Sequence, residues 1–218
     1  KIKLANVRAT LSLRDLHLLI READADWAGG KVKGGVDAAF SPLPKYEMTG
    51  EVERVNLAQL PWTPRWAERW SGTASGKIRL TTSGVGREDL LKQLAGLGEL
   101  KLNKVELRGW DVESSTESGS VRPGVSRWTS GQGEFEVGER EFRFDAIRLD
   151  VSHRNTQLAG AIGFDMSGNL TFRPLAPDQR SAKKVPTAHE FQLSGTLEAP
   201  KAVVQPVTTP RNIGTPKK

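Results

Sequence analysis

The sequence contains no cysteine in its 218 residues. Disulfide bonds, thiolate catalysis and cysteine-based zinc sites are therefore excluded. The absence does not identify a cellular compartment, because many periplasmic proteins also lack cysteine.

Long hydrophobic runs are also missing. No apolar stretch approaches the roughly 18 residues that a membrane-spanning helix needs. The first residue is Lys1, and no charged-then-apolar leader follows it. We therefore expect a fragment or processed piece whose targeting and anchoring segments lie upstream.

Residue patterns associated with catalysis are scarce. The three histidines, His17, His153 and His189, are far apart, and none falls in a metal-binding spacing such as HExxH. There is no nucleophile elbow, no Walker loop and no complete GxGxxG motif. Carboxylate pairs such as Asp24 and Asp26 fit the solvated face of a strand. The sequence therefore predicts no enzyme, no metal site and no cofactor.

Basic residues are in excess, with a formal net charge of +6 and a pI of about 9.7. Such an excess can indicate binding to nucleic acid or anionic lipid. Here the two signs alternate, as in Glu139-Arg140-Glu141, and basic pairs are concentrated only at Lys183-Lys184 and Lys217-Lys218. A solvated surface explains this distribution, and no nucleic-acid partner is predicted.

What the sequence does contain is a period of two. Leu100 and Leu102 alternate in one phase, and Val105 and Leu107 in the other, so a bulge or tight turn is expected at residues 103–104. Glycine-containing turns recur every eight to fifteen residues or so, as in a β meander. The sequence predicts a mostly β fold, a curved antiparallel meander sheet that is groove-like or sandwich-like, with two short packed helices.

The first of these helices is expected to follow a Thr63 cap and to place Trp66 and Trp70 on one face. With Trp62, these tryptophans fit a lid over the core, or a platform for sugar or a membrane interface. The second helix is expected at residues 87–95. Its apolar stripe of Leu90, Leu91 and Leu94 must pack against the sheet.

The domain organisation is predicted from composition. Residues 1–174 form one β-rich region, 175–187 a proline-rich linker or excursion, 188–204 the final strand of the same domain, and 205–218 a disordered tail. Within the first region, the serine- and glycine-rich residues 113–132 are expected to be a long exposed loop around Trp128.

Glycine-punctuated strands, with a small helix between them, are expected at residues 30–40, 45–57, 72–80, 89–91, 97–107, 142–172 and 194–200. In this order the segments resemble the C-terminal region of the AsmA family. The resemblance covers nearly all of residues 4–204 and departs at residues 114–130 and 175–186.

The resemblance implies a cellular role. AsmA-like proteins are held in the inner membrane by an N-terminal helix and have a long β-rich periplasmic part. They are tied to outer-membrane biogenesis, and their TamB-type relatives are thought to bridge the membranes and carry phospholipid. The expected partners are therefore phospholipid acyl chains, the inner membrane through an upstream helix, and other envelope proteins. The family has no catalytic residues to transfer.

A lipid groove would be lined by the apolar face of the meander at residues 142–172. The candidate residues are Phe142, Phe144, Ile147, Leu149, Val151, Ile162 and Phe164. Alternation alone does not separate an open groove from a filled core. Two other functions stay open: a non-catalytic scaffold that assists outer-membrane protein assembly, and carbohydrate binding through the tryptophans.

Overall fold

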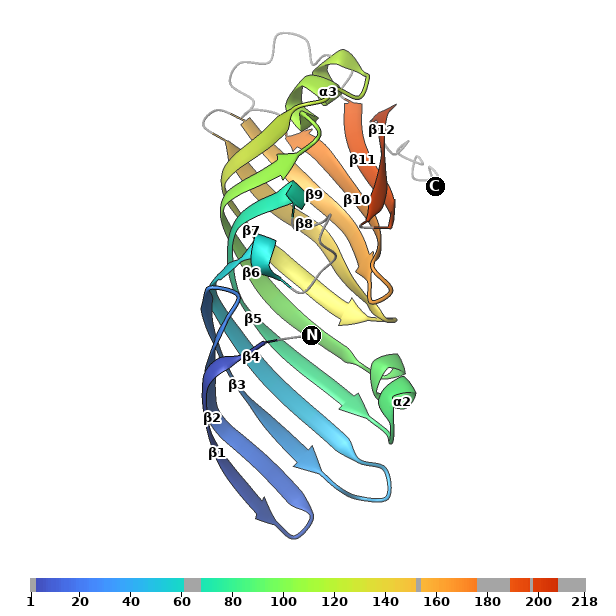
Figure 1. Cartoon of the computed structure of the whole chain (residues 1–218). Coiled ribbons are helices and arrows are strands. Elements are labelled where there is room, and N and C mark those ends of the chain that lie inside the picture. The colour runs from blue at the N-terminus through green and yellow to red at the C-terminus, as the bar shows by residue number, and fades with distance from the viewer. Residues whose placement is uncertain (1–2, 61–67, 152–153, 176–188, 197, 208–218) are drawn as a thin grey trace, which may run out of the picture.

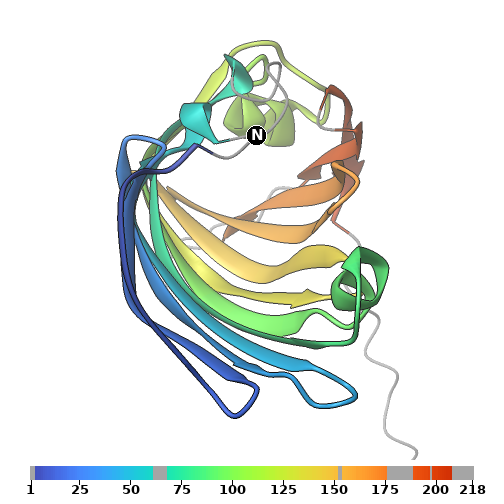
Figure 2. The same cartoon turned by 60° about the horizontal axis from the view of Figure 1, so that its bottom comes forward.

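The structure is a computed structural model, and it describes residues 3–60, 68–151, 154–175, 189–196 and 198–207. One antiparallel sheet of twelve strands dominates it, and the strands follow one another in chain order. Figures 1 and 2 show this sheet bent into a trough. The prediction of a mostly β, curved antiparallel meander is confirmed. The elements are β1 (Ala5–Arg14), β2 (His17–Trp27), β3 (Gly30–Ala39), β4 (Lys45–Asn56), η1 (Leu57–Gln59), β5 (Trp70–Ser83), α2 (Arg87–Lys92), β6 (Ala95–Arg108), α3 (Val112–Ser118), β7 (Val125–Gly138), β8 (Glu141–Val151), β9 (Arg154–Gly163), β10 (Ser167–Leu175), β11 (His189–Thr196) and β12 (Ala199–Pro206).

The meander gives the trough two rims. The connections that leave the odd-numbered strands, from β1–β2 to β11–β12, lie along one rim, which we call the hairpin rim. The connections that leave the even-numbered strands lie along the other, the loop rim. Helix α2 belongs to the hairpin rim and α3 to the loop rim, and Figure 1 shows them far apart.

Bulges bend several of the strands, among them β2, β4 and β6. Glu22 in β2, Arg54 in β4 and Lys104 in β6 have φ angles of 51°, 53° and 49°. The ladder shifts register beside each of them. An extra residue on one strand bends it and increases its twist, which helps to curl the sheet. The bulge predicted at residues 103–104 is therefore confirmed.

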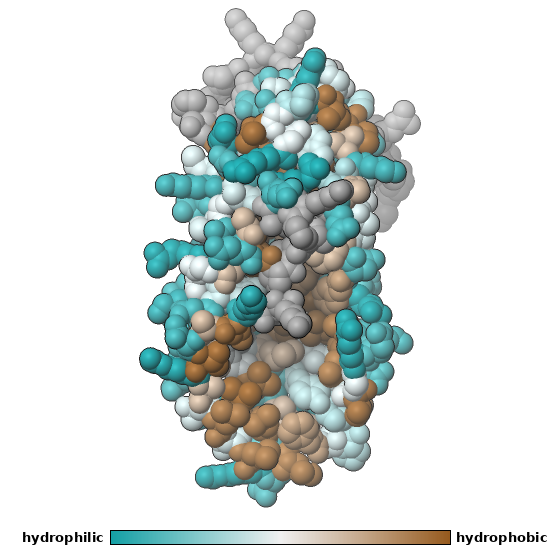
Figure 3. All heavy atoms as spheres, viewed as in Figure 1, coloured by the Kyte–Doolittle hydropathy of each residue, from teal (hydrophilic) through white to brown (hydrophobic). Residues whose placement is uncertain are grey.

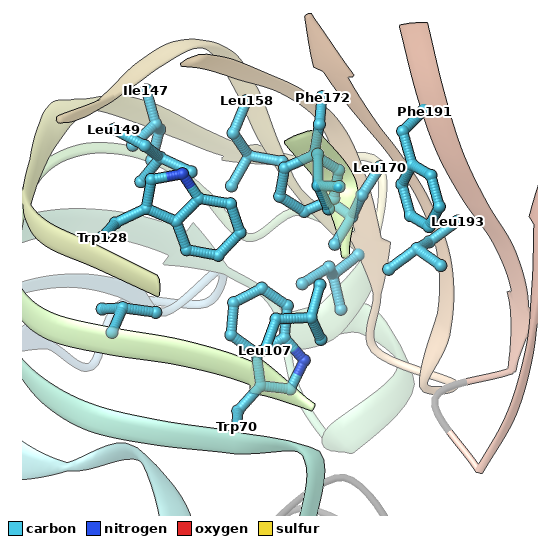
Figure 4. Packing of buried hydrophobic residues seen from close by; sticks show 13 residues of the cluster. Trp70, Leu107, Trp128, Ile147, Leu149, Leu158, Leu170, Phe172, Phe191 and Leu193 are labelled. Carbon is cyan, nitrogen blue, oxygen red and sulfur yellow. The ribbon is translucent and has the colours of Figure 1, made fainter. Parts of the chain in front are cut away.

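The buried core fills the trough between β5 and β11. Trp128 stacks on Phe172 with ring centroids 5.7 Å apart and an interplanar angle of 11°. Phe172 also meets Phe191 edge-on at 6.1 Å. Figure 4 shows such side chains pointing toward one another from different strands. Helix α3 closes this part of the trough with the buried Val112.

The exposed loop predicted at residues 113–132 is wrong. Helix α3 and the first half of β7 occupy most of this range, and only residues 120–124 form an exposed connection. Trp128 is a core residue at 5% exposure. The serines that suggested a loop bind the backbone instead. The Ser126 hydroxyl accepts from the Val112 amide at 2.8 Å and donates to the Trp110 carbonyl at 2.9 Å. Gly119 ends α3 in the left-handed conformation.

Only one of the two predicted helices can be compared with the described residues. The second is confirmed, but it ends at Lys92, and Leu90, Leu91 and Leu94 are half-buried rather than fully packed. The first falls mostly on residues 61–67, outside the described residues, as do Trp62 and Trp66. Trp70 does not belong to a helix but begins β5.

The C-terminal region holds one more strand than expected. Residues 188–204 were predicted as a single final strand, but β11 and β12 form a hairpin there, paired from His189↔Pro206 to Thr196↔Ala199. The expected linker lies almost wholly at residues 176–188, and most of the expected tail at 208–218. Both segments are outside the described residues.

Candidate functional site

Five of the seven candidate residues predicted from the sequence lie together in the filled half of the trough. Ile147 and Leu149 are 1% exposed, and Ile162 is also buried. Phe144 and Val151 pack against this core. The inner face of β8 and β9 at these positions is therefore covered by other side chains.

The remaining two candidates belong to an aromatic cluster nearer the hairpin rim. The Phe142 ring lies 5.4 Å from Phe164 and 6.2 Å from Phe135, measured between centroids. Phe135 also lies 6.1 Å from Phe144. All four rings are partly buried. The sequence located this cluster, except for Phe135.

An apolar face that the sequence did not single out lies on β1–β5. Residues directly opposite each other in a ladder share one face of the sheet. One such row runs Leu11↔Ile20↔Val36↔Met48↔Leu80. It lies on the same face of the sheet as the core and continues toward β12 through the same ladder. We call the following residues the open face: Leu11, Leu13, Leu18, Ile20, Val36, Met48, Ile78 and Leu80.

No second layer covers the open face among the described residues. The main contacts of β2 and β3 are with their ladder neighbours, and no residue of β1–β4 belongs to the buried core that joins β5 to β11. Leu11 and Leu13 are 65% and 67% exposed. Figure 3 shows a hollow with apolar side chains around it. These side chains are apolar, inward-facing and still accessible.

Residues with a small side chain or none lie beside this row. Ala23, Gly34 and Gly50 are directly opposite one another on β2, β3 and β4. Ile78 follows them on β5 and covers Gly50. The open face therefore combines large apolar side chains with a strip where the backbone itself lines the trough.

Aromatic side chains close the other end of the trough. Trp70, Leu107 and Trp128 are buried there, where β5–β7 meet β10 and β11. The Arg69 guanidinium lies 4.6 Å from the centre of the Trp110 ring, a cation–π contact on the flank of this cluster. An apolar ligand on the open face would therefore meet a filled core rather than a continuous channel.

The opposite face of the sheet is polar and carries ion pairs. Lys33 binds Glu53 at 2.9 Å, and Arg127 binds Glu106 at 2.9 Å. The hydrogen bond from Lys33, and then its charge, lower the pKa of the Glu53 carboxyl. The hydrogen bond from Arg127 likewise lowers the pKa of Glu106. These ion pairs are exposed to solvent, and each of them adds little to the stability of the fold.

A hollow of about 930 Å³ borders these polar side chains, and Ile78 of the open face also contributes to its lining. Its lining includes Lys33, Glu51, Lys77, Glu99 and Glu134. Charges of both signs alternate across the strands there, with Lys77 and Glu51 at 4.0 Å. It is a solvated part of the polar face, and we assign no ligand to it.

Each described histidine contacts a neighbouring element. His17 bonds to Asp37 across β2 and β3, and His189 Nδ1 lies 3.1 Å from the Thr116 carbonyl, joining β11 to α3. His153 lies outside the described residues. Within the described part, no three acidic or histidine side chains gather as metal ligands. Likewise, none of the described helices is long and apolar enough to cross a bilayer.

Comparisons with known proteins gave no match to a family model, to a curated protein or to a solved structure.

Proposed function

We propose that this chain is the periplasmic part of an AsmA-like envelope protein, anchored in the inner membrane, that binds phospholipid acyl chains on its open face. It would serve outer-membrane biogenesis by carrying phospholipid between the membranes, without catalysis. The resemblance of the strand pattern to the AsmA family supports the envelope role. The observation that carries the lipid proposal is an accessible, inward-facing apolar surface on β1–β5, with no protein layer described above it.

The physics of burial fits this role. Each methylene removed from water is stabilised by about 0.8 kcal/mol. An acyl chain that lies along the Ile20, Val36 and Met48 row would cover half-buried side chains and be covered on one side only. Binding of this kind is favourable but reversible, which a carrier requires. The polar opposite face keeps the protein in water while the lipid is held.

A scaffold that assists outer-membrane protein assembly is the second candidate. One observation favours it: the predicted groove residues Ile147 and Leu149 are packed in a filled core. A scaffold needs a rigid sheet and partner surfaces but no lipid. The two functions therefore differ in whether the open face is occupied by lipid.

Native mass spectrometry of the gently purified chain separates the two candidates. We expect phospholipid-sized adducts on the wild-type chain. The double variant Ile20→Asp, Met48→Asp should lose them, because charges on the open face repel acyl chains. The matched control Thr49→Asp, Thr81→Asp changes the net charge by the same amount on the polar face and should keep the adducts. A wild-type chain without lipid would favour the scaffold.

A further inference from the structure

We propose that three neighbouring tips of the hairpin rim dock on an anionic phospholipid bilayer. The tips carry Leu16 between β1 and β2, Leu43 between β3 and β4, and Val85 between β5 and α2. We call these three residues the apolar tips. The proposal rests on the proposed lipid-carrying function and adds the surface through which lipid would reach the open face.

The apolar tips are among the most exposed apolar side chains of the described residues. Leu16, Leu43 and Val85 are 70%, 55% and 69% exposed. On the described part of the loop rim, the exposed large apolar residues are Leu4 at 50%, Val121 at 40% and Leu175 at 36%, all less exposed than the apolar tips. Figure 3 shows apolar side chains gathered at the end of the molecule that the first hairpins form. Exposed apolar surface of this kind marks an interaction site.

Each apolar tip has a basic residue two positions away. Arg14 precedes Leu16, Lys45 follows Leu43, and Arg87 follows Val85. All three basic side chains are exposed, and none forms an ion pair with another described residue. A single pairing of this kind would carry little weight. The same arrangement, however, occurs in three separate turns.

This pairing fits the interface of an anionic bilayer. An apolar side chain can enter the acyl boundary while a neighbouring cation stays among the headgroups. Each basic residue near an anionic surface adds to the attraction. Acidic residues also lie near the tips, as at Asp15, Glu88 and Asp89, but within two positions of the three tips the three basic residues outnumber the single acidic one, Asp15. The charge therefore favours a membrane as the occupant.

The tips are continuous with the open face. Leu13 and Leu18, which flank the first tip, are directly opposite each other on β1 and β2. At the second tip the Phe40 ring meets Tyr46 edge-on at 6.3 Å. Strands lie about 4.8 Å apart, so neighbouring hairpins are about 10 Å apart and can reach one flat surface together. Lipid could thus pass from the bilayer to the open face along apolar side chains.

Flotation with vesicles of phosphatidylethanolamine and phosphatidylglycerol tests the docking. The triple variant Leu16→Ser, Leu43→Ser, Val85→Ser should bind at least about tenfold more weakly than the wild type, a loss of about 1.4 kcal/mol. The control Leu97→Ser removes an equally exposed side chain, 64% exposed, from the polar face of β6. It should bind within about twofold of the wild type.

Charge is tested separately with Arg14→Gln, Lys45→Gln, Arg87→Gln. This variant should lose the preference for phosphatidylglycerol over phosphatidylcholine vesicles. Equal flotation of the apolar-tip variant and the wild type would overturn the proposal. So would a dimer in sedimentation velocity that only the tip variant loses, without any flotation, because the tips would then bind a second copy.

The docking and the lipid-carrying function can fail independently. If the tips dock, the tip variant should still carry lipid adducts in native mass spectra when lipid is supplied in detergent, while it no longer floats. Vesicle binding by a chain that never carries lipid would sink the proposed function and leave the docking surface in place.

Discussion

At the residue scale, core residues and open-face residues occupy the same positions in the alternation. They differ in how many other side chains pack around them. Ile20 and Leu149 both lie on alternating strands and both face into the trough. Leu149 is 1% exposed within the packed cluster. Ile20 is half-buried between its ladder neighbours Leu11 and Val36 and lies outside that cluster. The two positions should therefore respond differently to charge.

We expect Leu149→Asp to unfold the protein, with a loss above about 3 kcal/mol, because it buries an unpaired carboxylate and removes core packing. Ile20→Asp should cost less than about 1 kcal/mol, because its carboxylate stays in water. Urea unfolding followed by tryptophan fluorescence measures both. An equal loss at the two positions would mean that the open face is buried.

A second residue-scale prediction concerns the bulge in β6. Gly72 lies opposite it with φ 116°, and a Cβ there would approach the Lys104 carbonyl oxygen to 2.6 Å and the Val105 Cα to 2.9 Å. Gly72→Ala should therefore cost more than about 2 kcal/mol. Gly138, at the end of β7, has nothing within 4 Å of such a Cβ. Gly138→Ala should stay within about 0.5 kcal/mol of the wild type in the same urea titration.

At the element scale, hydrogen bonding explains why α3 was not expected from the sequence. Its helix VESSTES is short and serine-rich, and its stability comes from its ends and from the sheet below. Asp111 Oδ1 accepts from the Ser114 amide at 3.0 Å, and Oδ2 accepts from the Ser114 hydroxyl at 2.7 Å. Alternation predicted the strands well because each one carries its own pattern. The alternation did not predict α3, because the Asp111 cap depends on the backbone conformation before the helix. That conformation is not visible in the pattern of apolar and polar residues.

The cap of α3 can be tested directly. Asp111→Ala should cost about 0.5–2 kcal/mol, because the first turn loses its acceptor. Asp111→Asn should remain within about 0.5 kcal/mol, since asparagine caps equally well. Thermal unfolding by circular dichroism gives both values. Identical stability of the alanine variant and the wild type would show that packing of Val112 alone holds α3.

At the scale of the whole molecule, the sequence predicted the meander but not which part of it is filled. The same alternation runs through β2–β4 and β8–β10, since both sets face one trough. What differs is the packing across the trough, since Leu149 belongs to a buried cluster that also includes Phe172 of β10 and Phe191 of β11. The alternation within one strand does not show whether side chains from other strands cover that strand. The predicted lipid contacts therefore fell on the packed half.

The central claim is that the open face holds acyl chains, and in-cell photo-crosslinking tests it most directly. A benzophenone amino acid would replace Ile20 or Met48 on the open face, and Arg21 or Thr49 on the polar face, one position at a time. The account predicts phospholipid adducts at Ile20 and Met48 and none at their sequence neighbours. Equal labelling at all four positions, or labelling at none of them, would contradict it.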